Sequence, residues 1–288
     1  MKKIALTSLL AVFAVSGAHA ANVIDGNPLY LPGAHHFYSV SSLGSHSQTG
    51  RAWTLAEEFG YGITDKLAIE LEADLSEHAA FDDYAWNNLS LGLTYRALDM
   101  GAWKTDIVLG YAAGDAGLSY LANGREVGAL AGHMHGKTKW FDKDATYYTW
   151  TAGVRGGYVA SNWTVAAHAL FNYFGEESFK WNADAGERGV HFVALGLDAQ
   201  YVICPHFSVL AGVEYKGVLD KEYQGRPGDK VENAGLWTGM LGANYNIDAT
   251  KYVGLYVSAD MDHQGGAKHD EWDVENGFGF GAKFGIDF

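Results

Sequence analysis

The chain is built from successive segments in which apolar residues alternate with small or charged ones. In 66–76 the charged residues fall on one face, opposite an apolar face made of Leu67, Ile69, Leu71, Ala73 and Leu75. A period of two places successive side chains on opposite faces of a β-strand. Strands with one apolar and one charged face indicate a sheet whose two faces meet different surroundings.

About twelve segments show this alternation, and each is close to the ten or so residues that a tilted transmembrane strand requires. The predicted strands are 34–44, 51–63, 66–76, 86–97, 103–113, 146–159, 162–174, 190–203, 206–218, 234–247, 251–262 and 276–288. All four prolines fall outside them, as a hydrogen-bonded ladder demands. A count of ten or fourteen also fits if the first strand or the 114–145 segment is misassigned.

The connections between the strands alternate between short and long. The short ones contain typical turn residues and lie at 63–66, 99–101, 160–162, 204–205 and 248–250. The long ones are polar and lie at 45–50, 77–85, 114–145, 175–189, 219–233 and 263–275. Outer-membrane barrels have short periplasmic turns and long external loops. We therefore predict an all-β, closed antiparallel transmembrane barrel of twelve strands with both termini in the periplasm.

The beginning of the chain has the pattern of an export signal. Lys2 and Lys3 precede an apolar run of about twelve residues, too short for a membrane-spanning helix of roughly 20, and Ala18-His19-Ala20 fits a cleavage site. We expect a signal peptide at 1–20, an N-terminal periplasmic segment at 21–33 and the transmembrane barrel at 34–288. No later apolar run approaches the length of a transmembrane helix, which excludes helical inner-membrane transport.

The other end of the chain carries a family resemblance. Residues 277–288 alternate throughout and finish on Phe288, which resembles the C-terminal insertion signal of Gram-negative outer-membrane β-barrel proteins. The resemblance implies a location in the outer membrane, in contact with its lipid and lipopolysaccharide, and assembly by the barrel-assembly machinery. The segment from Glu58 to Glu70 is also similar to a strand-turn-strand phrase of putative outer-membrane transporters grouped with aromatic-degradation pathways, a likeness that covers one hairpin and implies no substrate.

Composition and charge narrow the function. The 37 Gly, 17 Tyr, 14 Phe and 9 Trp suit a many-stranded protein. The formal charge of -14 argues against a nucleic-acid partner. Cys204 is the single cysteine, so no intramolecular disulfide can form.

The predicted lumen is rich in charge, and its residues are the candidate solute path. These are Glu58, Glu70, Glu72, Asp74, Arg96, Asp106, Arg155, His168, Asp198, Glu214, Lys216, Asp260 and Lys283. Buried charges need water or partners. In a channel for passive diffusion of small polar or charged solutes they would be wet. In a structural or surface-interaction barrel, an adhesin-like protein, they would pair and plug the lumen. We favour the channel and expect no cofactor.

Two further hypotheses concern the loops. The 114–145 connection either folds inward as a constriction or lies over the barrel mouth. It contains His133 and His135, which could share a metal only with further ligands.

An outer-membrane hydrolase would need a nucleophile and a base in mutual reach. No serine lies in a recognisable nucleophile motif. His191 lies close to Glu187 and Asp184, but these residues belong to an acidic loop. We therefore do not expect an enzyme.

Overall fold

The computed structural model describes residues 27–46, 53–77, 84–114, 145–178, 188–221, 235–262 and 277–288. These ranges contain twelve β-strands, which confirms the predicted count. The strands are β1 (Phe37–His46), β2 (Trp53–Thr64), β3 (Leu67–Glu77), β4 (Tyr84–Met100), β5 (Trp103–Gly114), β6 (Ala145–Val159), β7 (Trp163–Ser178), β8 (Arg188–Cys204), β9 (Phe207–Val218), β10 (Gly235–Asn246), β11 (Lys251–Asp262) and β12 (Gly277–Asp287). Within the described residues, no helix is long and apolar enough to cross a membrane.

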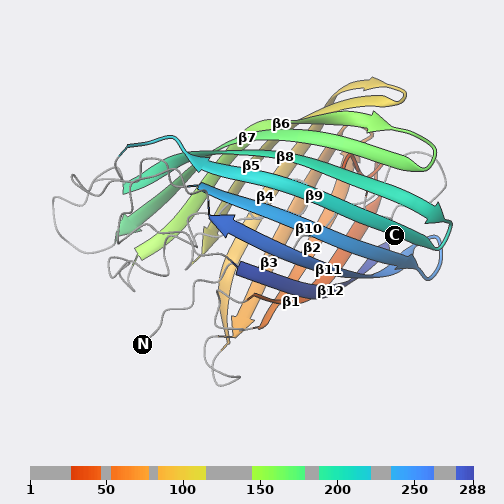
Figure 1. Cartoon of the computed structure of the whole chain (residues 1–288). Helices are drawn as coiled ribbons and strands as arrows, with labels where there is room; N and C mark the ends of the chain where they lie inside the picture. The colour runs from red at the N-terminus through yellow and green to blue at the C-terminus, as the bar shows by residue number, and fades with distance from the viewer. Residues whose placement is uncertain are drawn as a thin grey trace.

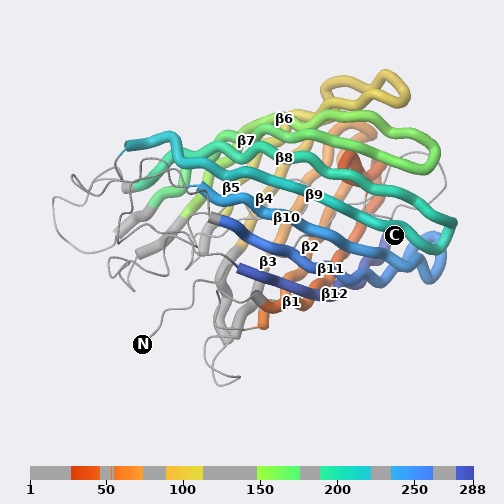
Figure 2. Tube along the Cα trace, viewed as in Figure 1, coloured from red at the N-terminus to blue at the C-terminus, as the bar shows by residue number. Residues whose placement is uncertain are grey.

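The strands form one closed antiparallel barrel in which each strand pairs with its neighbours in sequence (Figure 1). The two ends of the colour range meet where β1 pairs with β12 (Figure 2). Phe288 extends this seam. Its N–H donates to the carbonyl of Phe37 at 2.8 Å, and the N–H of Phe37 donates to the carbonyl of Phe288 at 3.3 Å. Closure leaves no unpaired strand edge.

The alternation places apolar residues outside and polar residues inside. In β11, Leu255 is 67% exposed, whereas Ser258 and Asp260 are 3% and 2% exposed. A protein that folds in water buries its apolar face, so this arrangement is reversed. An apolar belt around a polar interior is the arrangement that a lipid bilayer requires.

The described turns between strands gather at one end of the barrel, together with the C terminus (Figure 1). We call it the short-turn end. The turn between β10 and β11 is fixed by Asp248, whose Oδ1 accepts hydrogen bonds from the backbone N–H and the hydroxyl of Thr250 at 2.8 and 2.9 Å. The backbone hydrogen bond from Thr250, followed by the contact with Lys251, holds the pKa of Asp248 below its usual value. Gly101, with φ of 72°, supplies the left-handed residue in the turn between β4 and β5.

The strand ends differ from the predicted ones by no more than four residues. The first strand begins at Phe37 rather than at residue 34, because His35 has φ of 64° and the N–H of Ala34 donates to Asp65 rather than to a ladder. Glu57 shares the outward face of β2 with Leu55, Phe59 and Tyr61, so the alternation in the sequence also predicts a bulge there. The pairing of β2 with β1 runs through Glu57 without a shift, so that expectation is wrong.

Glu57 is accommodated by side chains of the neighbouring strand. Its carboxylate accepts hydrogen bonds from Ser39 and Ser41, which point outward from β1. Hydroxyl donors satisfy the carboxylate oxygens without any change of register. A local polar cluster on the outer surface therefore replaces the predicted bulge.

Candidate functional site

The candidate solute-path residues line the inside of the barrel, and those with described side chains are buried. None is more than 5% exposed: Glu58, Glu70, Glu72, Arg96, Asp106, Arg155, His168, Asp198, Glu214, Lys216, Asp260 and Lys283. Asp74 lies in β3, opposite Ala56 of β2. Burial of this many charges requires pairing. The geometry of the pairs therefore decides what the lumen can do.

A row of inward positions crosses eight neighbouring strands, from β4 to β11, each position directly opposite the next. We call it the polar row, and it consists of Arg96, Asp106, Arg155, His168, Gly196, Glu214, Thr238 and Asp260. Strands in a barrel tilt, so such a row climbs along the wall. Arg96 lies four residues before the end of β4 at the short-turn end, and Asp260 lies two residues before the opposite end of β11. The polar row therefore runs along the wall of the lumen from one end of the barrel toward the other.

The part of the polar row nearest the short-turn end is an ion cluster of three residues. Arg96 donates from Nε and Nη2 to the two carboxylate oxygens of Asp106, at 2.7 and 3.1 Å. Arg155 donates from Nε to Oδ2 of the same carboxylate at 2.7 Å. Charge-assisted pairs of this kind are the strong ones. Two guanidinium groups share one carboxylate, which leaves this part of the wall with a net positive charge.

In the middle of the polar row, the imidazole of His168 lies between two carboxylates. His168 Nε2 lies 2.6 Å from Oε2 of Glu214, and His168 Nδ1 lies 3.3 Å from Oδ2 of Asp198. Lys216 Nζ lies 3.3 Å from the other oxygen of Glu214. His168 is on β7 and Glu214 on β9, so the ring must cross β8. It crosses at Gly196, where a Cβ would lie 2.2 Å from Cε1 of the ring.

This crossing gives a testable prediction. Replacing Gly196 by alanine should push His168 away from Glu214 and lower the free energy of unfolding by about 1–3 kcal/mol, the usual cost of overpacking. Unfolding in urea, followed by tryptophan fluorescence in lipid vesicles, measures the change. The same replacement in a His168→Ala chain should cost less, because the obstructing ring is gone.

Gly239→Ala is the matched control, since the nearest atom to its Cβ would be the carbonyl oxygen of Ala259 at 4.0 Å. An equal cost for Gly196→Ala with and without the ring of His168 would show that Gly196 does not provide the crossing.

The part of the wall formed by β2 and β3, next to β4, is acidic. Glu58 of β2 and Glu72 of β3 are directly opposite each other, and Glu70 lies two residues before Glu72 on the same face. The hydroxyl of Tyr38 donates to Oε1 of Glu58 at 2.6 Å. Lys283 of β12 lies 5.6 Å from the ring centroid of Tyr252, within reach of a cation–π contact. These acidic residues adjoin the ion cluster, because β3 pairs directly with β4.

One part of the lumen was missed by sequence reasoning. Leu29, Tyr30 and Leu31 precede the first strand and are buried at 1, 3 and 5% exposure. Arg96 Nη2 donates to the carbonyl of Leu29 at 2.6 Å, and Arg155 Nη2 donates to the carbonyl of Tyr30 at 2.5 Å. Since both arginines face inward, these residues lie inside the barrel. The only signal in the sequence was the apolar triplet between Pro28 and Pro32.

The histidine candidates have different outcomes. His133 and His135 lie outside the described residues, as do Asp184 and Glu187. His191 contacts Asp220 instead, with Nδ1 3.0 Å from Oδ2. In the described part of the chain, no group of three or more His, Cys, Asp or Glu side chains could hold a metal ion.

Comparisons with known proteins agree with this architecture. No family model and no curated protein matches the chain. Among solved structures, the NanC porin is similar with a TM-score of 0.56 and 8% identity, over 86% of this chain and 98% of that one. The COG4313 outer membrane channel from Pseudomonas putida F1 is similar with a TM-score of 0.50 and 14% identity, over 95% of this chain and 100% of that one. The chain has the fold of outer-membrane porins and channels. At these identities the likeness concerns the fold.

Proposed function

We propose that the protein is an outer-membrane channel for passive diffusion of small polar or charged solutes. The observation that carries the proposal is the polar row, because it offers successive charged and polar partners along the wall of a barrel whose outer face is apolar. A solute that leaves water must exchange its hydration for such partners. The porin-like fold supports the same function. The short-turn end would face the periplasm, after removal of residues 1–20 and assembly by the barrel-assembly machinery.

The acidic wall supports a preference for cations. Glu58, Glu70 and Glu72 lie on adjoining strands, and a region of the wall with one sign of charge concentrates ions of the other sign. Replacing both Glu58 and Glu72 by glutamine should therefore shift the reversal potential in a salt gradient toward anions. The measurement is a planar-bilayer recording of the refolded mature protein.

Glu57→Gln is the matched control, because Glu57 is the sequence neighbour of Glu58 but lies on the outer face. It should leave the reversal potential unchanged. The recording is made on the native chain and on a chain in which Leu29, Tyr30 and Leu31 are replaced by serine, since these residues occupy the lumen. Silence from both chains, each shown to be folded, would contradict the channel.

The rival function is a structural or surface-interaction barrel with a plugged lumen. It is favoured by the burial of the inward charges and by their pairing in the Arg96, Asp106 and Arg155 cluster. Silence in the recordings would support this alternative. Among the described residues nothing comparable favours a hydrolase, since the ring nitrogens of His168 face the carboxylates of Glu214 and Asp198.

A further inference from the structure

The segment before β1 has the features of a plug that is held in place by specific contacts. Residues 27–36 run from the lumen to the start of β1, and Leu29, Tyr30 and Leu31 among them are buried inside the barrel. The segment is joined to the barrel only through β1 on one side. If the leader is removed after Ala20, as the sequence predicts, the other side is close to a free N terminus.

The arginines hold the segment through its backbone. Arg155 donates from Nε to Asp106 and from Nη2 to the carbonyl of Tyr30. Arg96 donates from Nε and Nη2 to Asp106, and its Nη2 also donates to the carbonyl of Leu29. The carbonyls are neutral acceptors, whereas the link to Asp106 is between opposite charges. Release of the segment would therefore leave the ion cluster intact, with guanidinium N–H groups available to water or to a solute.

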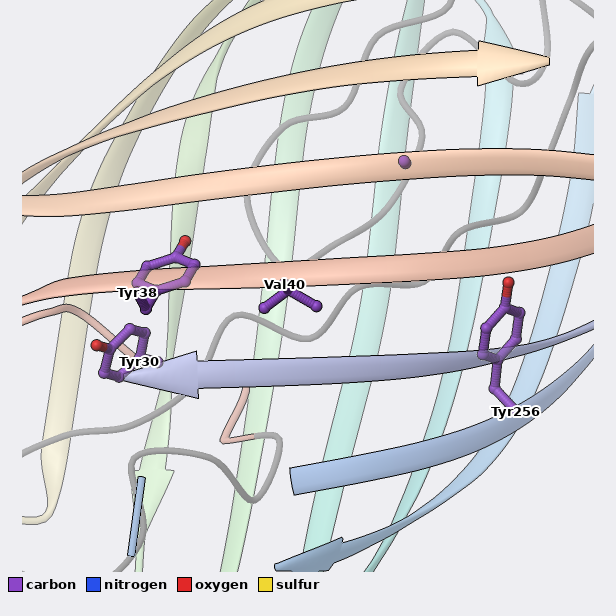
Figure 3. Packing of buried hydrophobic residues seen from close by; sticks show 5 residues of the cluster. Tyr30, Tyr38, Val40 and Tyr256 are labelled. Carbon is purple, nitrogen blue, oxygen red and sulfur yellow. The ribbon is translucent and has the colours of Figure 1, made fainter. Parts of the chain in front are cut away.

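The side chains of the segment provide the second contact. The ring of Tyr30 packs against that of Tyr38 at 5.4 Å between centroids, with an interplanar angle of 70°. Figure 3 shows the two rings side by side inside the barrel, with Val40 and Tyr256 in the same apolar cluster. An edge-to-face aromatic contact of this type is favourable beyond its buried area.

The chain enters the lumen over a glycine at the rim of the barrel. A Cβ at Gly62 would lie 1.9 Å from the carbonyl oxygen of Gly33 and 2.6 Å from that of Pro32. The backbone of Gly62 also accepts from the N–H of His35 at 2.7 Å and donates to the carbonyl of His36 at 2.9 Å. Residues 33–36 are thus fastened to the rim, and the residues before them extend into the lumen.

We propose that residues 27–36 form a tethered plug of the short-turn end, closed by the guanidinium groups of Arg96 and Arg155 and opened when these contacts are released. The regulatory role rests on the channel function proposed above. The location of the plug and its attachment to the arginines can be tested without any measurement of conduction.

The test is the rate at which a thiol reagent reaches the plug. In a Cys204→Ser chain, Leu31→Cys reports on the plug, and Leu219→Cys, at an exposed position after β9, is the accessible control. The refolded barrel in vesicles is treated with a charged methanethiosulfonate reagent. The thiol at position 31 should react at least about 100-fold more slowly than that at 219, because the reagent reaches it only in the open state.

Arg96→Lys together with Arg155→Lys should open the plug. Lysine preserves the charge beside Asp106, but its single nitrogen cannot reproduce the forked donation of arginine to two acceptors. The labelling rate at position 31 should rise at least about tenfold, the effect expected from losing a charge-assisted hydrogen bond. Lys251→Arg is the control for an exchange between lysine and arginine, because Lys251 pairs with Asp248 in an exposed turn, and it should leave the rate unchanged. If the lysine chain does not fold, Tyr30→Ser provides the same release by removing the ring contact.

The outcomes separate the two proposals. Equal labelling at 31 and 219 in the native chain would overturn the plug, and so would slow labelling that neither the lysine chain nor Tyr30→Ser accelerates. Faster labelling accompanied by higher conductance supports plug and channel together. Faster labelling of a barrel that stays electrically silent would overturn the channel, and with it the gating role, while leaving the attachment of the segment in place.

Discussion

Replacing Asp106 by asparagine should lower the free energy of unfolding by about 3–5 kcal/mol, the range for breaking a buried ion pair by removal of one partner. The carboxylate of Asp106 is fully buried and lies 2.7 Å from one nitrogen of Arg96 and 2.7 Å from one of Arg155. Without its charge, the guanidinium groups of Arg96 on β4 and Arg155 on β6, one on either side of β5, would repel each other. Urea unfolding in lipid vesicles measures the loss.

Asp99→Asn is the matched control, because Asp99 pairs with Lys104 at 2.9 Å but is 41% exposed. Its loss should cost less than about 1 kcal/mol, as for surface ion pairs. The double change D106N and R155M should cost less than the sum of the two single changes, since it removes one of the two repelling charges. A D106N chain no less stable than the D99N chain would show that the cluster contributes little to the barrel.

The second large effect is expected on the outer face. Leu109 is 47% exposed near the middle of β5, and an arginine there should destabilise the barrel by about 2–4 kcal/mol if that face contacts the centre of a bilayer. An arginine at Met100, the last residue of β4, should cost about 0–1 kcal/mol, because side chains near the interface reach water. Leu109→Ala controls for the lost leucine.

This comparison tests the membrane location separately from any transport activity. On a face that contacts water, an arginine at either position would change the stability by no more than about 0.5 kcal/mol. Equal, small costs at Leu109 and Met100 would therefore contradict the bilayer around the barrel. Unfolding in vesicles of defined thickness is the appropriate measurement, since detergent can adapt to a charged side chain.

Local alternation was sufficient to predict the fold but not the contents of the lumen. The strand containing Leu255 and Asp260 is readable from its own residues, because side-chain direction in a strand depends only on parity. The contact between His168 and Glu214 depends instead on the registers of three strands and on the absence of a side chain at Gly196. No single stretch of sequence contains that information.

The position of the N-terminal segment also depends on residues far away in the sequence. Leu29 and Tyr30 are bonded to arginines 67 and 125 residues away in the chain, and nothing in the short segment itself indicates these partners. The sequence therefore predicted a periplasmic location for residues 21–33, but no contact between them and the barrel. The apolar character of Leu29, Tyr30 and Leu31 is explained once they are seen inside the barrel, since three such residues would be poorly placed in water.

The seam between β1 and β12 has a consequence for biogenesis. Every other pairing in the barrel joins strands that follow each other in the chain, but this one joins the first strand to the last, and it ends in the reciprocal bonds of Phe37 and Phe288. β1 therefore has an unpaired edge until β12 pairs with it. During that interval the nascent sheet is a template for wrong pairing. The risk lasts until β12 pairs with β1, so the rate at which this one seam closes determines how long the sheet is open to wrong partners.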